Sequence, residues 1–140
     1  MKAVLDTSVL VSAFLKPDSL PGAVVRAGIT GRYELCLSLD ILAETGRILR
    51  DKPRLRQRYR YPDKDVLQYL EDLLAVADVV TELPLLSPVS RDPNDDHVIA
   101  AALSAGAAVI VSGDDDLLSL EAYEGIRMLT VQAFHDQWTP

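Results

Sequence analysis

The chain opens with Lys2-Ala3-Val4-Leu5-Asp6-Thr7-Ser8, a stretch that predicts a short buried strand running directly into a helix. Residues 3–5 are apolar, and the two hydroxyl residues that follow Asp6 are typical of a helix start. In open α/β sheets, ligands bind beyond the carboxyl ends of the strands. If the protein is an enzyme, Asp6 is therefore expected at the centre of its site.

Further apolar strands alternate with helical segments along the chain. Strands are predicted at residues 33–38, 78–81, 107–112 and 125–131, and helices at residues 9–15, 21–27, 40–49, 63–76, 92–104 and 132–138. This alternation predicts an α/β protein with a mainly parallel sheet covered on both faces. The basic segment between Pro53 and Pro62, with the helices beside it, predicts a helical hairpin around residues 40–77. The length predicts a single domain, residues 1–140.

Composition and charge exclude several classes of protein. Hydrophobic residues make up 49% of the chain and charged residues 25%, as in ordinary globular proteins. The net charge of −7 argues against a protein that holds nucleic acid mainly by a general basic surface. The longest apolar stretch, residues 98–111, is too short for a membrane span, and Asp6 interrupts any signal peptide. A cytoplasmic protein with no membrane contact is expected, with Cys36 as a buried structural thiol.

Carboxylates recur at the predicted strand ends and helix starts. They are Asp6, the helical Glu44, the cluster Asp92, Asp95 and Asp96, and the cluster Asp114, Asp115 and Asp116. Carboxylates that converge in one cleft repel one another unless a cation lies among them. Because no cysteine or histidine cluster offers softer ligands, an all-oxygen site indicates Mg²⁺ or Mn²⁺. Such an ion suits hydrolysis of phosphate esters.

Four sequence blocks together resemble the signature of PIN domains, and above all the VapC-like toxins of bacterial toxin–antitoxin pairs. The blocks are Leu5-Asp6-Thr7-Ser8-Val9-Leu10, the apolar helix that carries Glu44, Asp96-His97-Val98-Ile99-Ala100-Ala101-Ala102, and Val111-Ser112-Gly113-Asp114-Asp115-Asp116-Leu117-Leu118. Each block alone is a weak signal, but their common order and spacing is a strong one. The resemblance implies a three-layer α/β/α sandwich and a metal-dependent endoribonuclease.

The resemblance also implies roles for individual residues. It assigns the metal-binding acids to four positions, which are Asp6, Glu44, Asp96 and Asp114, and polar supporting roles to Ser8 and Ser112. Asp96 is chosen because it lies nearest the apolar run of its helix, and Asp92 is then an outer partner or a helix cap. Asp116 is left open as a residue that shares or replaces the role of Asp114. Asp95 is interpreted as a helix-start residue and His97 as a helix-surface or core residue.

Half of the basic residues lie in one window of the chain. They include Arg47, Arg50, Arg54, Arg56, Arg58 and Arg60, interleaved with Tyr59 and Tyr61. Arginine and tyrosine together can grip phosphates and stack on single-stranded bases. A solvated helix face is an equally good interpretation, and an acidic partner segment is a further one. A VapC-like toxin is also expected to bind its antitoxin and to form a homodimer.

The sequence therefore predicts a Mg²⁺- or Mn²⁺-dependent endoribonuclease, the toxin of a toxin–antitoxin pair. One alternative is a metal-dependent phosphatase acting on a small phosphoester. Against it, Asp6-Thr7-Ser8 lacks the second aspartate, two places on, that an aspartyl-phosphate phosphatase would use. Another alternative is a catalytically silent PIN domain that only binds RNA or protein, against which the full set of acids counts.

Overall fold

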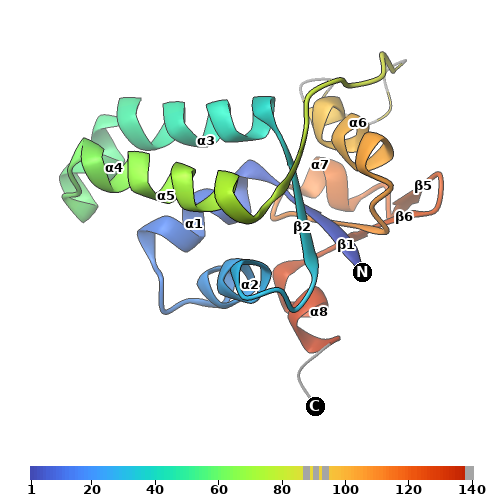
Figure 1. Ribbon diagram of the computed structural model, residues 1–140, viewed down its shortest axis with the longest axis horizontal. Coiled ribbons are helices and arrows are strands. Elements are labelled where there is room, and N and C mark those ends of the chain that lie inside the picture. Colours follow the sequence, from blue (N-terminus) through green and yellow to red (C-terminus); the bar gives the residue numbers. More distant parts are fainter. Residues whose placement is uncertain (87–88, 90–91, 93–94, 138–140) are drawn as a thin grey trace.

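In the computed structural model, which describes residues 1–86, 89, 92 and 95–137, six strands form one sheet (Figure 1). The strands are β1 (Lys2–Leu5), β2 (Glu34–Ser38), β3 (Asp78–Val80), β4 (Val109–Val111), β5 (Ala122–Tyr123) and β6 (Ile126–Leu129). Their order across the sheet is β3-β2-β1-β4-β6-β5. Every neighbouring pair is parallel except β5 and β6. The predicted mainly parallel sheet is confirmed.

The strand order places a topological switch point between β1 and β4. From β1 the chain crosses to β2 on one side, whereas β4 pairs with the other side of β1. At such a point the connections leave the sheet in opposite directions, which opens a crevice at the carboxyl ends of the strands. The residues that follow β1 and β4, Asp6 and Ser112–Asp114, are therefore brought to the same crevice.

Helices cover both faces of the sheet. They are α1 (Thr7–Leu15), α2 (Leu20–Ile29), α3 (Leu39–Asp51), α4 (Pro53–Tyr59), α5 (Asp63–Val76), α6 (Asp96–Ala105), α7 (Asp115–Leu118) and α8 (Val131–Asp136). Helix α6 packs on one side, against β1 and β2, and α2 and α8 lie on the other side (Figure 1). The three-layer α/β/α arrangement is confirmed. In the part of the chain described, no helix is long and apolar enough to cross a membrane.

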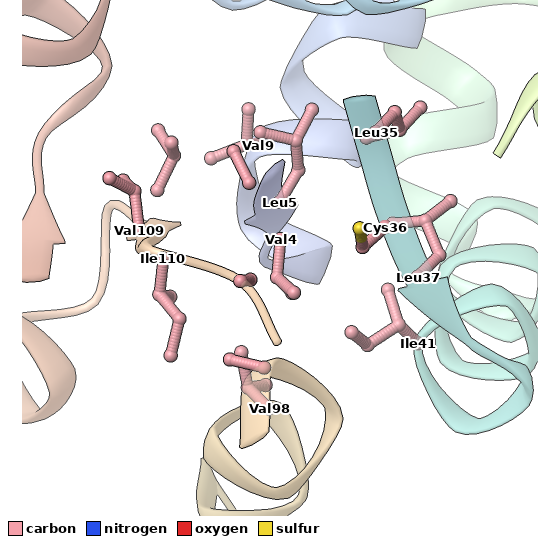
Figure 2. Close-up of a cluster of buried hydrophobic side chains, with 14 of the residues drawn as sticks. Val4, Leu5, Val9, Leu35, Cys36, Leu37, Ile41, Val98, Val109 and Ile110 are labelled. Carbon is pink, nitrogen blue, oxygen red and sulfur yellow. The ribbon is translucent and has the colours of Figure 1, made fainter. Parts of the chain in front are cut away.

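The core fills the space between the strands and the helices. Val4, Cys36 and Ile110 occupy matched positions on adjacent strands, so their side chains share one face of the sheet. Val4 and Ile110 point toward Val98 of α6, and Leu5 points to the opposite side (Figure 2). Burial raises the pKa of the Cys36 thiol to about 11, as suits an inert structural side chain.

The predicted helical hairpin is formed by α3 and α5, which lie side by side with α4 at the turn between them (Figure 1). A Cβ atom on Gly46 would lie 3.0 Å from Cδ1 of Leu70, so a glycine at this position allows the two helices to approach closely. The Tyr69 hydroxyl donates a hydrogen bond to the carbonyl oxygen of Leu10 (2.7 Å), which ties α5 to α1. The hairpin is therefore anchored on the helix that follows Asp6.

Most element boundaries differ from the prediction by one or two residues, and the differences are larger at α6, β4 and the last strand. Helix α6 begins at Asp96, not at Asp92, and residues 93–94 lie outside the described part of the chain. Strand β4 is shorter than predicted because the amide of Ala107 closes the end of α6 by bonding the carbonyl of Ala102. The last strand begins after Gly125, whose φ of +81° belongs to a tight turn, and the short antiparallel β5 was not predicted. The predicted end of the last helix, Trp138, lies outside the described residues.

Candidate metal centre

Asp6 is fixed at the carboxyl end of β1 and is only 7% exposed. Its Oδ1 accepts a hydrogen bond from the Thr7 amide (2.7 Å), so Asp6 is the N-cap of α1, a role that the sequence suggested for Thr7 or Ser8. Its Oδ2 accepts a hydrogen bond from the Ser112 hydroxyl (2.7 Å). Burial raises the pKa of Asp6 above its usual value, and the negative charges of Asp114 and Glu44 raise it further. The two hydrogen bonds oppose this shift.

Two serines connect the ends of β1 and β4. The Ser112 hydroxyl donates to Asp6 and also accepts a hydrogen bond from the Asp114 amide (2.9 Å). The Ser8 hydroxyl accepts from the Gly113 amide (3.2 Å) and lies 3.4 Å from Oδ2 of Asp6. These hydrogen bonds therefore fix the end of β1 against the end of β4, although the bonded residues lie about 105 positions apart in the chain. Ser8 and Ser112 therefore both contact Asp6, and their supporting role in the site stays a prediction.

Asp114 is the N-cap of α7, and its side chain shares a hydrogen bond with Asp95, the residue before α6. Its Oδ1 accepts a hydrogen bond from the Asp116 amide (2.9 Å), which orients the Asp114 side chain. Asp92, Asp95 and Asp116 each offer one carboxylate oxygen, and the three atoms lie within 4.8 Å of one another. All three side chains are partly buried. The second and third acidic clusters of the sequence therefore converge.

Asp95 is the most perturbed acid of this group. Its burial, a hydrogen bond shared with Asp114, and the charges of Asp114, Asp6 and Asp92 raise the pKa of Asp95 to about 8. Its Oδ2 atom is buried and has no hydrogen-bond partner among the described residues. A buried carboxylate oxygen without a donor, surrounded by other carboxylates, is the arrangement that a cation would satisfy.

Asp96, the residue chosen from the sequence, points elsewhere. Its Oδ2 accepts a hydrogen bond from the Val89 amide (3.0 Å), and the residue lines a hollow of about 350 Å³ with His97 and Asp40. Adjacent helical residues are rotated by about 100°, so Asp96 projects in a different direction from Asp95 at the start of α6. The geometry favours Asp95. The signal was present in the sequence, because Asp95 lies one and two helical turns before Ile99 and Ala102, which are fully buried.

Glu44 approaches the acids from α3 and is oriented by a residue that the sequence interpretation did not assign to the site. Nε2 of His97 lies 3.4 Å from Oε2 of Glu44. The Glu44 side chain is 35% exposed, and its charge acts on Asp6. His97 therefore links the helix that begins after Asp95 to the helix that carries Glu44.

The arginines of the basic segment have different surroundings. Arg56 bonds the Asp63 carboxylate (2.6 Å) and the Tyr61 carbonyl, and Arg58 lies over the ring of Tyr59. Nε of Arg50 donates to a carbonyl of its own helix, and Arg60 is the left-handed C-cap of α4. Arg47 lines a hollow with Glu44 and His97, and Arg54 lines a cleft that reaches Ser8. Among the six predicted arginines, Arg47 lines a hollow that contains Glu44, and Arg54 lines a cleft that contains Ser8.

The donor set of the site consists of oxygen atoms. Carboxylate oxygens in a partly buried crevice are the ligands that Mg²⁺ and Mn²⁺ prefer. The raised pKa values of Asp6 and Asp95 and the unpartnered Oδ2 of Asp95 show that the described residues do not neutralise one another. The residues therefore fit a divalent cation.

Sequence comparison gives two matches that cover most of the chain. A family profile described as PIN domain matches residues 2–116. The uncharacterized protein MJ1680 of Methanocaldococcus jannaschii is 31% identical over 121 residues, which are 86% of this chain and 75% of that protein. All of the acids described above lie within the residues that match the family profile.

Two solved structures share the fold. PAE2754 from Pyrobaculum aerophilum has a TM-score of 0.64 at 19% identity, over 98% of this chain and 88% of that chain. VapBC2 from Rickettsia felis, solved bound to a DNA fragment from their promoter, has a TM-score of 0.57 at 14% identity, over 93% of this chain and 98% of that chain. At these identities the likeness shows the fold alone.

Proposed function

Because this chain belongs to the PIN domain family, whose members are typically metal-dependent nucleases, we propose that it is a divalent-metal-dependent endoribonuclease. The observation that carries the proposal is the convergence of Asp92, Asp95 and Asp116, whose carboxylate oxygens lie within 4.8 Å of one another. The charge of the buried Asp6 also acts on this group. Neighbouring carboxylates that raise the pKa of a buried acid, as they do for Asp95, are arranged for a cation.

The proposed metal ligands are Asp95, which belongs to this group, and Asp6 and Asp114, whose charges act on Asp95. Asp92 and Asp116 lie beside Asp95, and the charge of Glu44 acts on Asp6. Asp95 takes the place that the sequence interpretation gave to Asp96. Mg²⁺ or Mn²⁺ is proposed because every donor is an oxygen. When bound, the ion would make a water nucleophilic at neutral pH and offset the charge that develops on a phosphodiester.

The protein side chains of this site orient the acids before any substrate arrives. Ser112 and the Thr7 amide hold both oxygens of Asp6, and the Asp116 amide holds Asp114. His97 restrains Glu44 from the opposite helix. Fixing charged groups in advance lowers the reorganisation that the reaction needs, which is how such sites gain most of their rate.

We further propose that the protein is a VapC-like toxin that acts in the cytoplasm. The support is its likeness in fold to VapBC2 and the four sequence blocks described above. This proposal implies an antitoxin as a protein partner and a homodimer as the functional assembly. Sedimentation of the purified protein, and co-purification with the product of a neighbouring reading frame, would test these two expectations.

The nuclease proposal is tested by incubating wild type and Asp6→Asn with total RNA in Mg²⁺, in Mn²⁺ and in chelator. We expect discrete, metal-dependent cuts by the wild type, and a rate lower by a factor of about 100 or more in Asp6→Asn, the usual cost of losing one electrostatic contributor. Circular dichroism would confirm that the variant is folded.

Cuts of equal rate in Asp6→Asn would contradict the proposal, because the activity would then come from another site or a contaminant. Turnover of p-nitrophenyl phosphate without RNA cleavage would favour the phosphatase alternative. Binding of RNA with no cleavage in either metal would favour a catalytically silent domain.

A further inference from the structure

A cleft of about 640 Å³ lies between α1 and the segment that joins α3 to α4. Val11 of α1 forms one apolar side of it, and Ile48 and Leu55 form the other. Lys52 and Arg54 add two cationic side chains to the same lining. The cleft therefore combines an apolar wall with basic groups.

The cleft adjoins the acidic residues through Ser8. Ser8 lines the cleft, and its hydroxyl lies 3.4 Å from Oδ2 of Asp6 and accepts a hydrogen bond from the Gly113 amide. A polymer bound in the cleft would therefore lie next to the residue that contacts Asp6.

The cations of the cleft differ from their neighbours on the same segment. Arg56 is held by Asp63 and by the carbonyl and ring of Tyr61. Within residues 1–86, 89, 92 and 95–137, neither Lys52 nor Arg54 forms an ion pair, and both are exposed. Asp51 is the single acid in the lining, so the cleft carries a net positive charge beside a strongly negative site.

We infer that this cleft binds the single-stranded RNA that flanks the scissile phosphate, with Lys52 and Arg54 contacting its phosphates and the apolar wall receiving a base. The inference rests on the proposed nuclease function and specifies where its substrate lies. A single strand is favoured because its bases are free to leave the stack and pack on a protein surface. The two cations of the lining supply charge complementarity with the phosphates.

The test is RNA binding by the full-length protein, measured without cleavage. Fluorescence anisotropy with a labelled oligouridylate would give Kd for the Asp6→Asn protein in Mg²⁺, alone and combined with Lys52→Ala and Arg54→Ala. We expect the two cleft substitutions together to weaken binding on the order of tenfold or more. The slope of log K against log salt should fall by roughly 0.7 for each phosphate that the variant no longer neutralises.

Arg58→Ala is the matched control for Arg54→Ala, because it removes one arginine from the same helix but does not line the cleft. Its Kd and salt slope should stay close to those of the Asp6→Asn parent. An equal loss in Arg58→Ala, or no loss in the cleft variants, would overturn the inference. An acidic protein segment as the true occupant of the cleft would give the second of these results.

The outcome also separates this inference from the nuclease proposal. If the wild type cuts RNA and the cleft variants bind RNA as well as their parent, only the cleft assignment fails. If the wild type neither cuts nor binds RNA, both fail. Photo-crosslinking of 4-thiouridine RNA followed by mass spectrometry should place adducts within residues 48–55, and adducts confined to other surfaces would contradict the assignment.

Discussion

Two regions of the molecule concentrate charge of one sign. One is the acidic edge of the sheet, formed by Asp6, Asp95 and Asp114 with their acidic neighbours, and the other is the basic segment around α4. The fold neutralises the two regions differently. The charges that act on Asp95 come from Asp114, Asp6 and Asp92, and all of them are negative. In the basic segment, Arg56 is paired with Asp63 and stacked on Tyr61. The arginine has local partners of opposite charge, whereas the neighbours of Asp95 are acids that raise its pKa.

This difference indicates which of the two charged regions is arranged to bind a ligand of opposite charge. Burying like charges together costs free energy, so a fold retains them where an external counter-charge offsets the cost. Locally paired surface charges need no external partner and contribute little. The acidic edge therefore indicates a cation site, whereas Arg56, which is paired with Asp63, needs no external partner.

The sharpest test exchanges neighbouring acids that point in different directions. Asp95→Asn should lower RNA cleavage by a factor of about 100 or more, because it removes a carboxylate from the group that faces Asp6. Asp96→Asn should change the rate by only a few-fold, because the Asp96 carboxylate accepts a hydrogen bond from the Val89 amide. Cleavage rates in Mn²⁺, with melting temperatures as the folding control, would check both.

The opposite ranking would restore Asp96 as the metal-binding acid and break the geometric argument. Equal loss in both variants would indicate that the start of α6 is remodelled when substrate or metal binds.

A second test uses protons as competitors of the cation. Asp95 keeps its proton up to about pH 8 in the folded protein, but only to about pH 4 in an unfolded chain. The folded state therefore binds more protons between these values, and the stability of the metal-free protein should fall as pH rises through this window. Because a bound cation displaces that proton, its apparent affinity should rise with pH, by about tenfold per unit below pH 8.

Isothermal titration with Mn²⁺ between about pH 6 and pH 8, and thermal melts in chelator over the same range, would measure the two slopes. Asp95→Asn is the control, since it lacks the titrating group and should flatten most of the pH dependence of stability. A wild-type affinity that does not change with pH would contradict the coupling between Asp95 and the cation.

The sequence predicts the sheet better than it predicts the site. The strand at residues 2–5 and the helix at 63–76 follow from simple apolar patterns, and the structure has both within these bounds. The positions of Asp6 and Asp114 follow equally well, because Asp6 comes directly after β1 and Asp114 follows β4 by three residues. These predictions depend only on neighbours in the chain.

The choice between Asp95 and Asp96 depends on helix rotation, which the sequence shows only through the burial of Ile99 and Ala102 several residues later. The contact between His97 and Glu44 joins two helices that are remote in sequence, and no local pattern encodes it. The ion pair of Arg56 with Asp63, seven positions on, forms across the turn between α4 and α5, and its geometry becomes evident only in the folded structure. Tertiary contacts therefore decide which members of a charged cluster are available for binding.

A smaller effect is expected when a side chain that holds Asp6 in place is removed. Ser112→Ala removes the hydroxyl that donates to Asp6 and accepts from the Asp114 amide. We expect unfolding stability to fall by about 1–3 kcal/mol, the cost of leaving buried polar groups without partners. The pKa of Asp6 should rise further, because the Ser112 hydrogen bond lowers it.

Urea denaturation would measure this loss, with Ser119→Ala as the control. The exposed Ser119 hydroxyl donates only to the carbonyl of Asp116, so its removal should change stability by less than about 0.5 kcal/mol. A similar small loss in Ser112→Ala would mean that the hydroxyl does not hold the two strand ends together.

The smallest effect is expected in the basic segment, where it separates structural from binding arginines. Arg56→Ala should lower unfolding stability by up to about 1 kcal/mol, because its ion pair with Asp63 is largely exposed, and it should leave RNA affinity almost unchanged. Arg54→Ala should do the reverse, weakening RNA binding without a measurable loss of stability, because the described residues give its side chain no ion pair. Parallel urea melts and anisotropy titrations of the two variants would measure both. If Arg56→Ala weakened RNA binding as much as Arg54→Ala, local pairing would not distinguish the two kinds of arginine, and the whole segment would have to be treated as one RNA-binding surface.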